Sequence, residues 1–187
     1  MTTSLYRFLA PIAVCVAWLS GCATPAPLVV APDMRWSAEG RVSIQSVIEG
    51  QNRIDTARFA WTERPQTSEL ALYSPFGDTL AQVRVEPERA VLRLPDKIAT
   101  AASVDALVAR ELGIELPVSG LRYWLRGEDT QGRRRAPESF EEDGWRVAYS
   151  QMDEAIPSLP KTLRLERAQP APVSVRVAVE RWMGIDK

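Results

Sequence analysis

The chain has 187 residues, of which 45% are hydrophobic, with a formal net charge of -1 and no histidine. The absence of histidine excludes Ser-His-Asp and Cys-His catalysis and the common histidine metal sites. The small net charge does not fit the basic surface of a nucleic-acid-binding protein. We therefore expect no catalytic residue, no cofactor, no metal site and no nucleic-acid partner.

The N-terminal segment has the layout of a secretory signal that ends in Leu19-Ser20-Gly21-Cys22. Arg7 precedes an apolar run over residues 8–19, about a dozen residues, whereas a membrane-spanning helix needs roughly 20. Two small residues followed by cysteine form a lipobox, in which cleavage exposes the cysteine and its thiol becomes acylated. We predict removal of residues 1–21 and lipidation of Cys22. An ordinary secretory signal with a chance cysteine is the alternative.

The mature chain divides into a tether and one domain. Residues 22–34 carry Pro25, Pro27 and Pro32, which favours an extended tether. Residues 35–187 have the size of one ordinary domain. With Cys15 lost in the signal and Cys22 bound to lipid, the domain has no thiol for a disulfide or a cysteine metal site.

After the tether, apolar and polar residues alternate with the period of β-strands. In the second strand, for example, Ala57, Phe59 and Trp61 alternate with Arg58, Ala60 and Thr62. The predicted strands of this half cover residues 36–48, 53–63, 70–73, 80–86 and 89–94.

The period then changes to that of a helix. Ser103 is a candidate N-cap for a helix over residues 104–112, and Gly113 is a candidate stop. A second short helix is predicted over residues 119–126. The two helices are thus expected directly after the fifth strand.

The rest of the chain returns to strands. After a polar loop, Asp143-Gly144 predicts a hairpin between two strands, and residues 162–167 and 173–181 form the last two. With nine or ten strands in all, we expect a mainly β fold. Its form would be a single, strongly curved antiparallel sheet, an incomplete or open β-barrel, with a short helical lid.

Two charged clusters are interpreted mainly as solvated surface segments. The run Glu141-Glu142-Asp143 could be a catalytic pair only if it were buried, and its place in a hairpin predicts a solvated turn. The run Arg133-Arg134-Arg135 could bind lipid phosphates or an acidic partner, and a solvated loop is the preferred interpretation.

The aromatic residues are more informative. They come from separate predicted elements, and together they exceed what the core of a small half-barrel needs, which suggests an apolar ligand cavity; a packed core is the alternative. The candidate cavity residues are Phe59, Trp61, Tyr123, Trp124, Trp145, Tyr149 and Trp182.

A further aromatic stands in a tight turn. Phe76 lies between Pro75 and Gly77, in a turn too short to fold the ring far back. We expect the ring to project and to enter a membrane; a ring folded back onto the core is the alternative.

Several short motifs are spread over nearly the whole mature chain. They are the lipobox, Gly40-Arg41-Val42, Phe59-Ala60-Trp61, Ser74-Pro75-Phe76-Gly77, residues 113–117, Leu121-Arg122-Tyr123-Trp124-Leu125-Arg126-Gly127, residues 144–149, Leu159-Pro160 and Trp182. Taken together and in this order, these motifs resemble the LolB family of outer-membrane lipoproteins. The family usually has an aliphatic residue where this chain has Phe76.

The resemblance implies a receptor anchored in the outer membrane through Cys22, with its domain facing the periplasm. Such a receptor accepts lipoproteins from a soluble, LolA-like periplasmic carrier and inserts them into the outer membrane. Its partners would be that carrier, cargo lipoproteins and outer-membrane lipid, and we expect a monomer. The alternative is a lipid-anchored scaffold that binds a protein or cell-wall partner. A lipid hydrolase is disfavoured because the chain has no histidine and no Gly-x-Ser-x-Gly motif.

Overall fold

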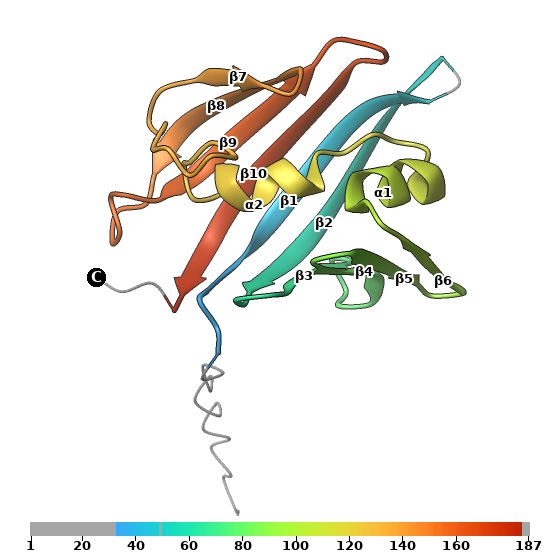
Figure 1. The fold of residues 1–187 in the computed structure, drawn as a ribbon. Coiled ribbons are helices and arrows are strands. Elements are labelled where there is room, and N and C mark those ends of the chain that lie inside the picture. Colours follow the sequence, from blue (N-terminus) through green and yellow to red (C-terminus); the bar gives the residue numbers. More distant parts are fainter. Residues whose placement is uncertain (1–32, 49, 185–187) are drawn as a thin grey trace, which may run out of the picture.

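The structure, a computed structural model, describes residues 33–48 and 50–184. Cys22, the lipobox and nearly all of the predicted tether lie outside these residues. The described chain forms one ten-stranded sheet in the order β6-β5-β4-β3-β2-β1-β10-β9-β8-β7, with every neighbouring pair antiparallel. Figure 1 shows the sheet curling around the two helices without closing, so the predicted open barrel with a helical lid is confirmed.

Strand bounds match the alternation of the sequence closely in the first half of the chain. The strands are β1 Trp36–Ile48, β2 Gln51–Glu63, β3 Ser68–Tyr73, β4 Thr79–Glu86, β5 Arg89–Leu94, β6 Lys97–Ala101, β7 Phe140–Glu142, β8 Trp145–Met152, β9 Pro160–Arg167 and β10 Val173–Met183.

Strands β10 and β2 show why the sheet has one apolar face. In β10 the side chains of Val173, Val175, Val177 and Val179 are all buried. These residues face the core because side chains two residues apart point to the same side of a strand. The same alternation places Phe59 and Trp61 of β2 in the core. The concave face is therefore apolar along its whole centre.

A sixth strand precedes the helices, so the expectation that they follow the fifth strand was wrong. Lys97–Ala101 pairs with β5 through a two-residue connection at Pro95-Asp96. Alanine has a weak strand preference, which hides this strand in the sequence. Its small inward residues Ala99 and Ala101 pack at the margin of the core, close to the first helix.

The first helix, α1 (Val104–Leu112), has the predicted caps. The Ser103 side chain accepts a hydrogen bond from the Ala106 N–H at 3.3 Å, and Gly113 ends the helix with a φ of 70°. This left-handed backbone favours glycine. Val104, Leu107 and Val108 are the buried residues of α1, which contacts β5 and β6.

The second helix, α2 (Val118–Trp124), lies across the hollow of the sheet in Figure 1 and is shorter than the predicted 119–126. Its last turn tightens, with the Arg126 N–H donating to the Tyr123 carbonyl at 2.9 Å. Gly120 leaves room for the neighbouring turn, because a Cβ there would lie 2.7 Å from Cζ2 of Trp124. None of the helices in the described residues is long and apolar enough to span a membrane.

Candidate functional site

An apolar cavity lies between α2 and the concave face of the sheet. Its volume is about 60 Å³, and every side chain that lines it is hydrophobic. Five strands, β1, β2, β3, β9 and β10, supply the walls together with α2 and the residues that flank it. The lining residues are Val42, Ile44, Phe59, Trp61, Leu70, Leu72, Leu116, Pro117, Val118, Leu121, Leu125, Leu165, Val175 and Val177.

The cavity is small but incompletely sealed. A water molecule occupies roughly 30 Å³ of liquid, so the present volume is only about that of two waters. Several lining side chains are nevertheless only half-buried, including Leu72 of β3 and Leu121 of α2. Movement of α2 away from the sheet would both widen the cavity and open it.

The predicted cavity aromatics fall into two groups. Phe59 and Trp61 line the cavity, whereas the other five lie outside its lining. Trp61 stacks on Trp36, with ring centroids 6.3 Å apart, and Trp36 in turn contacts Trp182 at 5.8 Å. Trp182 therefore belongs to an aromatic cluster beside the cavity that also includes Trp36, a residue the sequence prediction did not select.

Trp124 and Tyr149 hold the C-terminal end of α2. The ring of Trp124 is fully buried and meets the edge of Phe140, and the Tyr149 hydroxyl donates to the Trp124 carbonyl at 3.1 Å. Burial raises the pKa of the Tyr149 hydroxyl, so it remains a donor. Tyr123 lies under the guanidinium of Arg122.

A buried carboxylate joins α2 to the sheet near the cavity. Glu63, at the end of β2, is 3% exposed and accepts a hydrogen bond from the Ser68 hydroxyl at 2.6 Å. Its other oxygen forms an ion pair with Arg122 of α2. The sequence prediction missed this contact, although the parity of Phe59, Trp61 and Glu63 places all three on the inner face.

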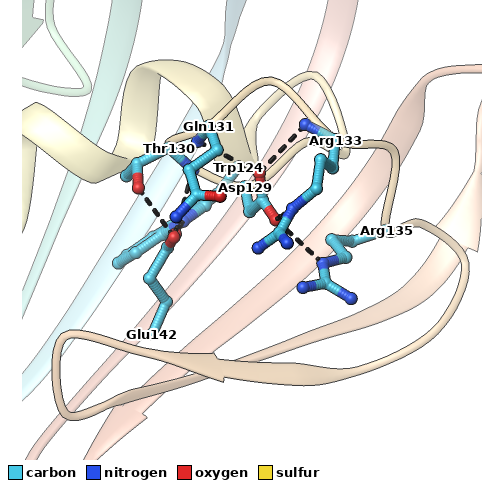
Figure 2. Close-up of polar contacts among 7 residues, drawn as sticks. All are labelled: Trp124, Asp129, Thr130, Gln131, Arg133, Arg135 and Glu142. Carbon is cyan, nitrogen blue, oxygen red and sulfur yellow. Dashed lines mark hydrogen bonds and ion pairs between the residues drawn. The ribbon is translucent and has the colours of Figure 1, made fainter.

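A second buried carboxylate organises the loop that follows α2 (Figure 2). Asp129 is 1% exposed and accepts from the Arg133 N–H and Nε, at 2.9 and 2.7 Å, and from Arg135 Nε at 3.1 Å. Burial opposes ionisation of Asp129, but these donors and charges outweigh it and lower its pKa to about 2. The side chains of Arg133 and Arg135 remain 60% and 40% exposed, as the prediction of a solvated loop requires, and both also form ion pairs with the buried Asp129.

Figure 2 also shows Glu142 of β7 reaching this loop. Its carboxylate accepts from Trp124 Nε1 and from the Thr130 hydroxyl, each at 2.7 Å. The prediction of a solvated acidic turn was wrong for Glu142, because the turn itself is confined to Asp143 and Gly144, both with positive φ. The loop thus fastens the end of α2 to the edge of the sheet. Among the residues described, no group of three or more acidic, cysteine or histidine residues could hold a metal ion.

The turn between β3 and β4 projects from the domain. The Ser74 hydroxyl accepts from the N–H groups of Phe76 and Asp78, both at 3.2 Å, and Gly77 has a φ of 97°. This tight turn leaves the Phe76 side chain 95% exposed, so the prediction of a projecting ring is confirmed.

Comparison with known proteins gives a consistent result. The family model described as "Outer membrane lipoprotein LolB" matches residues 34–182. An outer-membrane lipoprotein LolB from Ralstonia nicotianae is 35% identical, with 91% of this chain and 94% of that protein covered. The LolB of Bordetella petrii is 36% identical, with 88% of each chain covered.

Among solved structures, a LolA superfamily protein from Nitrosomonas europaea matches with a TM-score of 0.44 and 9% identity, over 84% of this chain and 89% of that one. The residues that match the family model include the apolar cavity, α2 and the projecting turn. The chain belongs to the LolB family of outer-membrane lipoproteins.

Proposed function

We propose that this protein accepts lipoproteins from a soluble periplasmic carrier, holds their acyl chains between α2 and the sheet, and passes them to the outer membrane. The role in outer-membrane lipoprotein localisation follows from the family. The observation that supports the acyl-chain mechanism is the cavity under α2, whose lining contains no polar side chain. No bond has to be formed or broken in this process.

The free-energy cost of exposing an acyl chain to water favours a binding site from which water is excluded. An acyl chain of roughly 15 methylenes gains about 0.8 kcal/mol per buried CH₂, so exposing it to water costs on the order of 12 kcal/mol. Such a chain cannot cross the periplasm or wait at the membrane in water. The concave face offers the surface it needs, since Val42, Ile44 and Leu72 already keep part of their side chains uncovered.

Loading requires α2 to move, because the closed cavity of about 60 Å³ is too small for a chain. The helix is well placed for this movement. It contributes Val118 and Leu121 to the cavity, and polar contacts to Glu63 and Glu142 hold its C-terminal turn. Acyl chains would replace the contacts that α2 makes with the sheet.

We assign the delivery of cargo lipoproteins to the membrane to the turn that carries Phe76. A Phe side chain that enters a bilayer gains roughly 1.5–3 kcal/mol, enough to orient the domain but not to trap it. Residues 23–35 between the lipid anchor and the domain reach about 40 Å at about 3.1 Å per residue in an extended chain. The turn can therefore meet the same membrane that holds Cys22.

The cavity is tested by titrating the unlipidated domain with a synthetic tripalmitoylated cysteine lipopeptide. We expect Leu121→Gln to weaken binding roughly tenfold, because a polar side chain then faces the acyl chain, with a smaller effect on thermal stability. Ile98→Gln, at a residue of β6 that is 61% exposed and outside the cavity lining, is the matched control. Failure of the wild-type domain to bind the lipopeptide would instead favour the scaffold alternative.

A further inference from the structure

We infer that Ser46 and Arg167 form a polar end to the acyl cavity and bind the carbonyl oxygens at the head of the acyl chains. This inference rests on the proposed acyl-chain function and adds a site of different chemistry to it. An acyl chain begins with a carbonyl group by definition. A cavity that holds such chains therefore has to accommodate a hydrogen-bond acceptor at one end.

Strand register places the two residues directly beyond the apolar lining. Ile44 of β1, Val175 of β10 and Leu165 of β9 pair with one another in one row and line the cavity. The next row on the same face is Ser46, Val173 and Arg167, also paired across the three strands. Successive residues on one face lie about 7 Å apart along a strand. The apolar wall thus changes to polar within one step.

Both polar side chains carry a donor that the folded chain leaves unused. The Ser46 side chain is 95% buried, and its hydroxyl has no hydrogen-bond partner within the described part of the chain. The same holds for Nε of Arg167, which is buried. Buried polar atoms are almost always hydrogen-bonded, and a donor left unpaired is costly, so two in one row call for an explanation.

The guanidinium of Arg167 is held in place, but not all of its hydrogen-bond donors are used. Arg167 lies over the ring of Trp145, 4.9 Å from its centroid, and forms an ion pair with Glu115 at 2.7 Å. Glu115 is half-exposed and directly precedes Leu116 and Pro117 of the cavity lining. Displacement of this segment together with α2 would free the guanidinium at the moment the cavity opens.

There is also space next to the row. Ser46, Val173 and Arg167 line a hollow of about 550 Å³ between the β1–β2 and β9–β10 hairpins. This volume lies within the range of small-molecule sites. It could receive the linking group of a lipid whose chains extend toward Ile44 and Leu165.

The test compares a probe that has carbonyl groups with one that has none. The first is the tripalmitoylated cysteine lipopeptide, and the second is diphenylhexatriene, a hydrocarbon dye. We expect Arg167→Met to weaken lipopeptide binding by about tenfold and Ser46→Ala by about threefold, as for lost hydrogen bonds to charged and neutral donors. Binding of the dye should change by less than about twofold in both.

The outer face supplies matched controls. Ser43 and Arg164 flank Arg176 in one row of the same three strands, on the opposite side of the sheet. Ser43→Ala and Arg164→Met should leave the binding of both probes unchanged. Glu115→Gln removes the ion pair but keeps the Arg167 donors, so it should bind the lipopeptide at least as tightly as the wild type does.

Several outcomes would overturn the inference. Equal loss of lipopeptide and dye binding would assign Arg167 and Ser46 to the fold, and unchanged lipopeptide binding would remove their role. A third probe, palmitate, has a carboxylate as its head group. If the variants lose binding of palmitate but keep binding of the lipopeptide, the site binds free fatty acid instead. A wild-type domain that binds the dye but shows no preference for the lipopeptide would refute this site alone, whereas one that binds neither probe would refute the proposed function as well.

Discussion

Gly40 allows β1 and β10 to approach each other at the point where their register shifts. A Cβ at this position would lie 2.0 Å from the Ala178 carbonyl oxygen and 3.0 Å from Cε1 of Phe59. The first contact is with backbone, which cannot rotate away. The absence of a side chain at Gly40 therefore allows β1 and β10 to pack closely beside Phe59, which lines the cavity.

We expect Gly40→Ala to destabilise the domain by at least about 1–3 kcal/mol, because the strands must separate to admit the methyl group. Urea denaturation of the domain measures this loss. Ser43→Ala on the outer face of the same strand is the control. A change within about 0.5 kcal/mol of zero for Gly40→Ala, as for an ordinary surface substitution, would contradict the explanation.

Asp129 makes the loop after α2 sensitive to acid. Its pKa of about 2 lies below the ordinary value of 3.8, so the unfolded chain takes up this proton at a higher pH than the folded chain does. The stabilisation that ionised Asp129 provides is complete above about pH 4 and is lost as the pH falls toward 2. Acid should therefore loosen the loop that secures α2.

Thermal unfolding at a series of pH values checks this prediction. In Asp129→Asn the melting temperature should be lower at neutral pH and should depend less on pH between about 4 and 2 than in the wild type. Asp96→Asn, in an exposed turn, should keep the wild-type dependence. If both variants show the wild-type slope, other carboxylates cause the acid response.

At the scale of elements, polar contacts rather than intrinsic helix propensity hold the lid helix α2 in place. It is a helix of seven residues, and isolated helices of this length are unstable in water. The ion pair of Arg122 with buried Glu63 joins it to β2. Removing one partner of such a pair leaves a buried charge without compensation.

Arg122→Met should therefore raise the hydrogen-exchange rate of the α2 amides while the strands keep their protection. Arg126→Met, which removes an ion pair with Glu128 just beyond the helix, is the control and should have a smaller effect. Unchanged exchange in Arg122→Met would show that apolar packing alone closes the lid. The double variant Glu63→Gln, Arg122→Met measures how strongly the two residues are coupled.

The elements differ in how well the sequence predicts them, for physical reasons. Long strands with strict alternation, such as Trp36–Ile48, were predictable to the residue, as were the caps of α1 at Ser103 and Gly113. The strand Lys97–Ala101 was not, since small residues give little alternation.

The polar contacts of the site were less predictable still. Glu63 and Arg122 are 59 positions apart, and only the curvature of the sheet brings them together. The same applies to the cavity. The sequence indicated a surplus of aromatic residues, but most of the wall is aliphatic, and only Phe59 and Trp61 of the seven candidates line it. Which apolar residues face one another across a curved sheet depends on register and on the position of α2.

At the scale of the whole molecule, the three functions proposed for the domain occupy different places. The cavity lies under α2, the polar row of Ser46 and Arg167 lies one step beyond it, and Phe76 projects from the β3–β4 turn. Because these places do not share residues, a variant can affect one function and leave the others unchanged. Acceptance and delivery of cargo should therefore be separable by mutation.

Phe76→Glu is the variant that separates them. The ring is 95% exposed and has no core contact to lose, so folding and lipopeptide binding should stay close to wild type, while a charged tip can no longer enter a bilayer. In a reconstituted assay with carrier, cargo lipoprotein and liposomes, the variant should accept cargo normally and release it at a small fraction of the wild-type rate. Gln66→Glu adds the same charge to the turn at the other end of β3 and should release cargo normally. Phe76→Leu should retain delivery, since the tip needs only an apolar side chain. Normal release by Phe76→Glu would show that the projecting ring does not deliver the cargo.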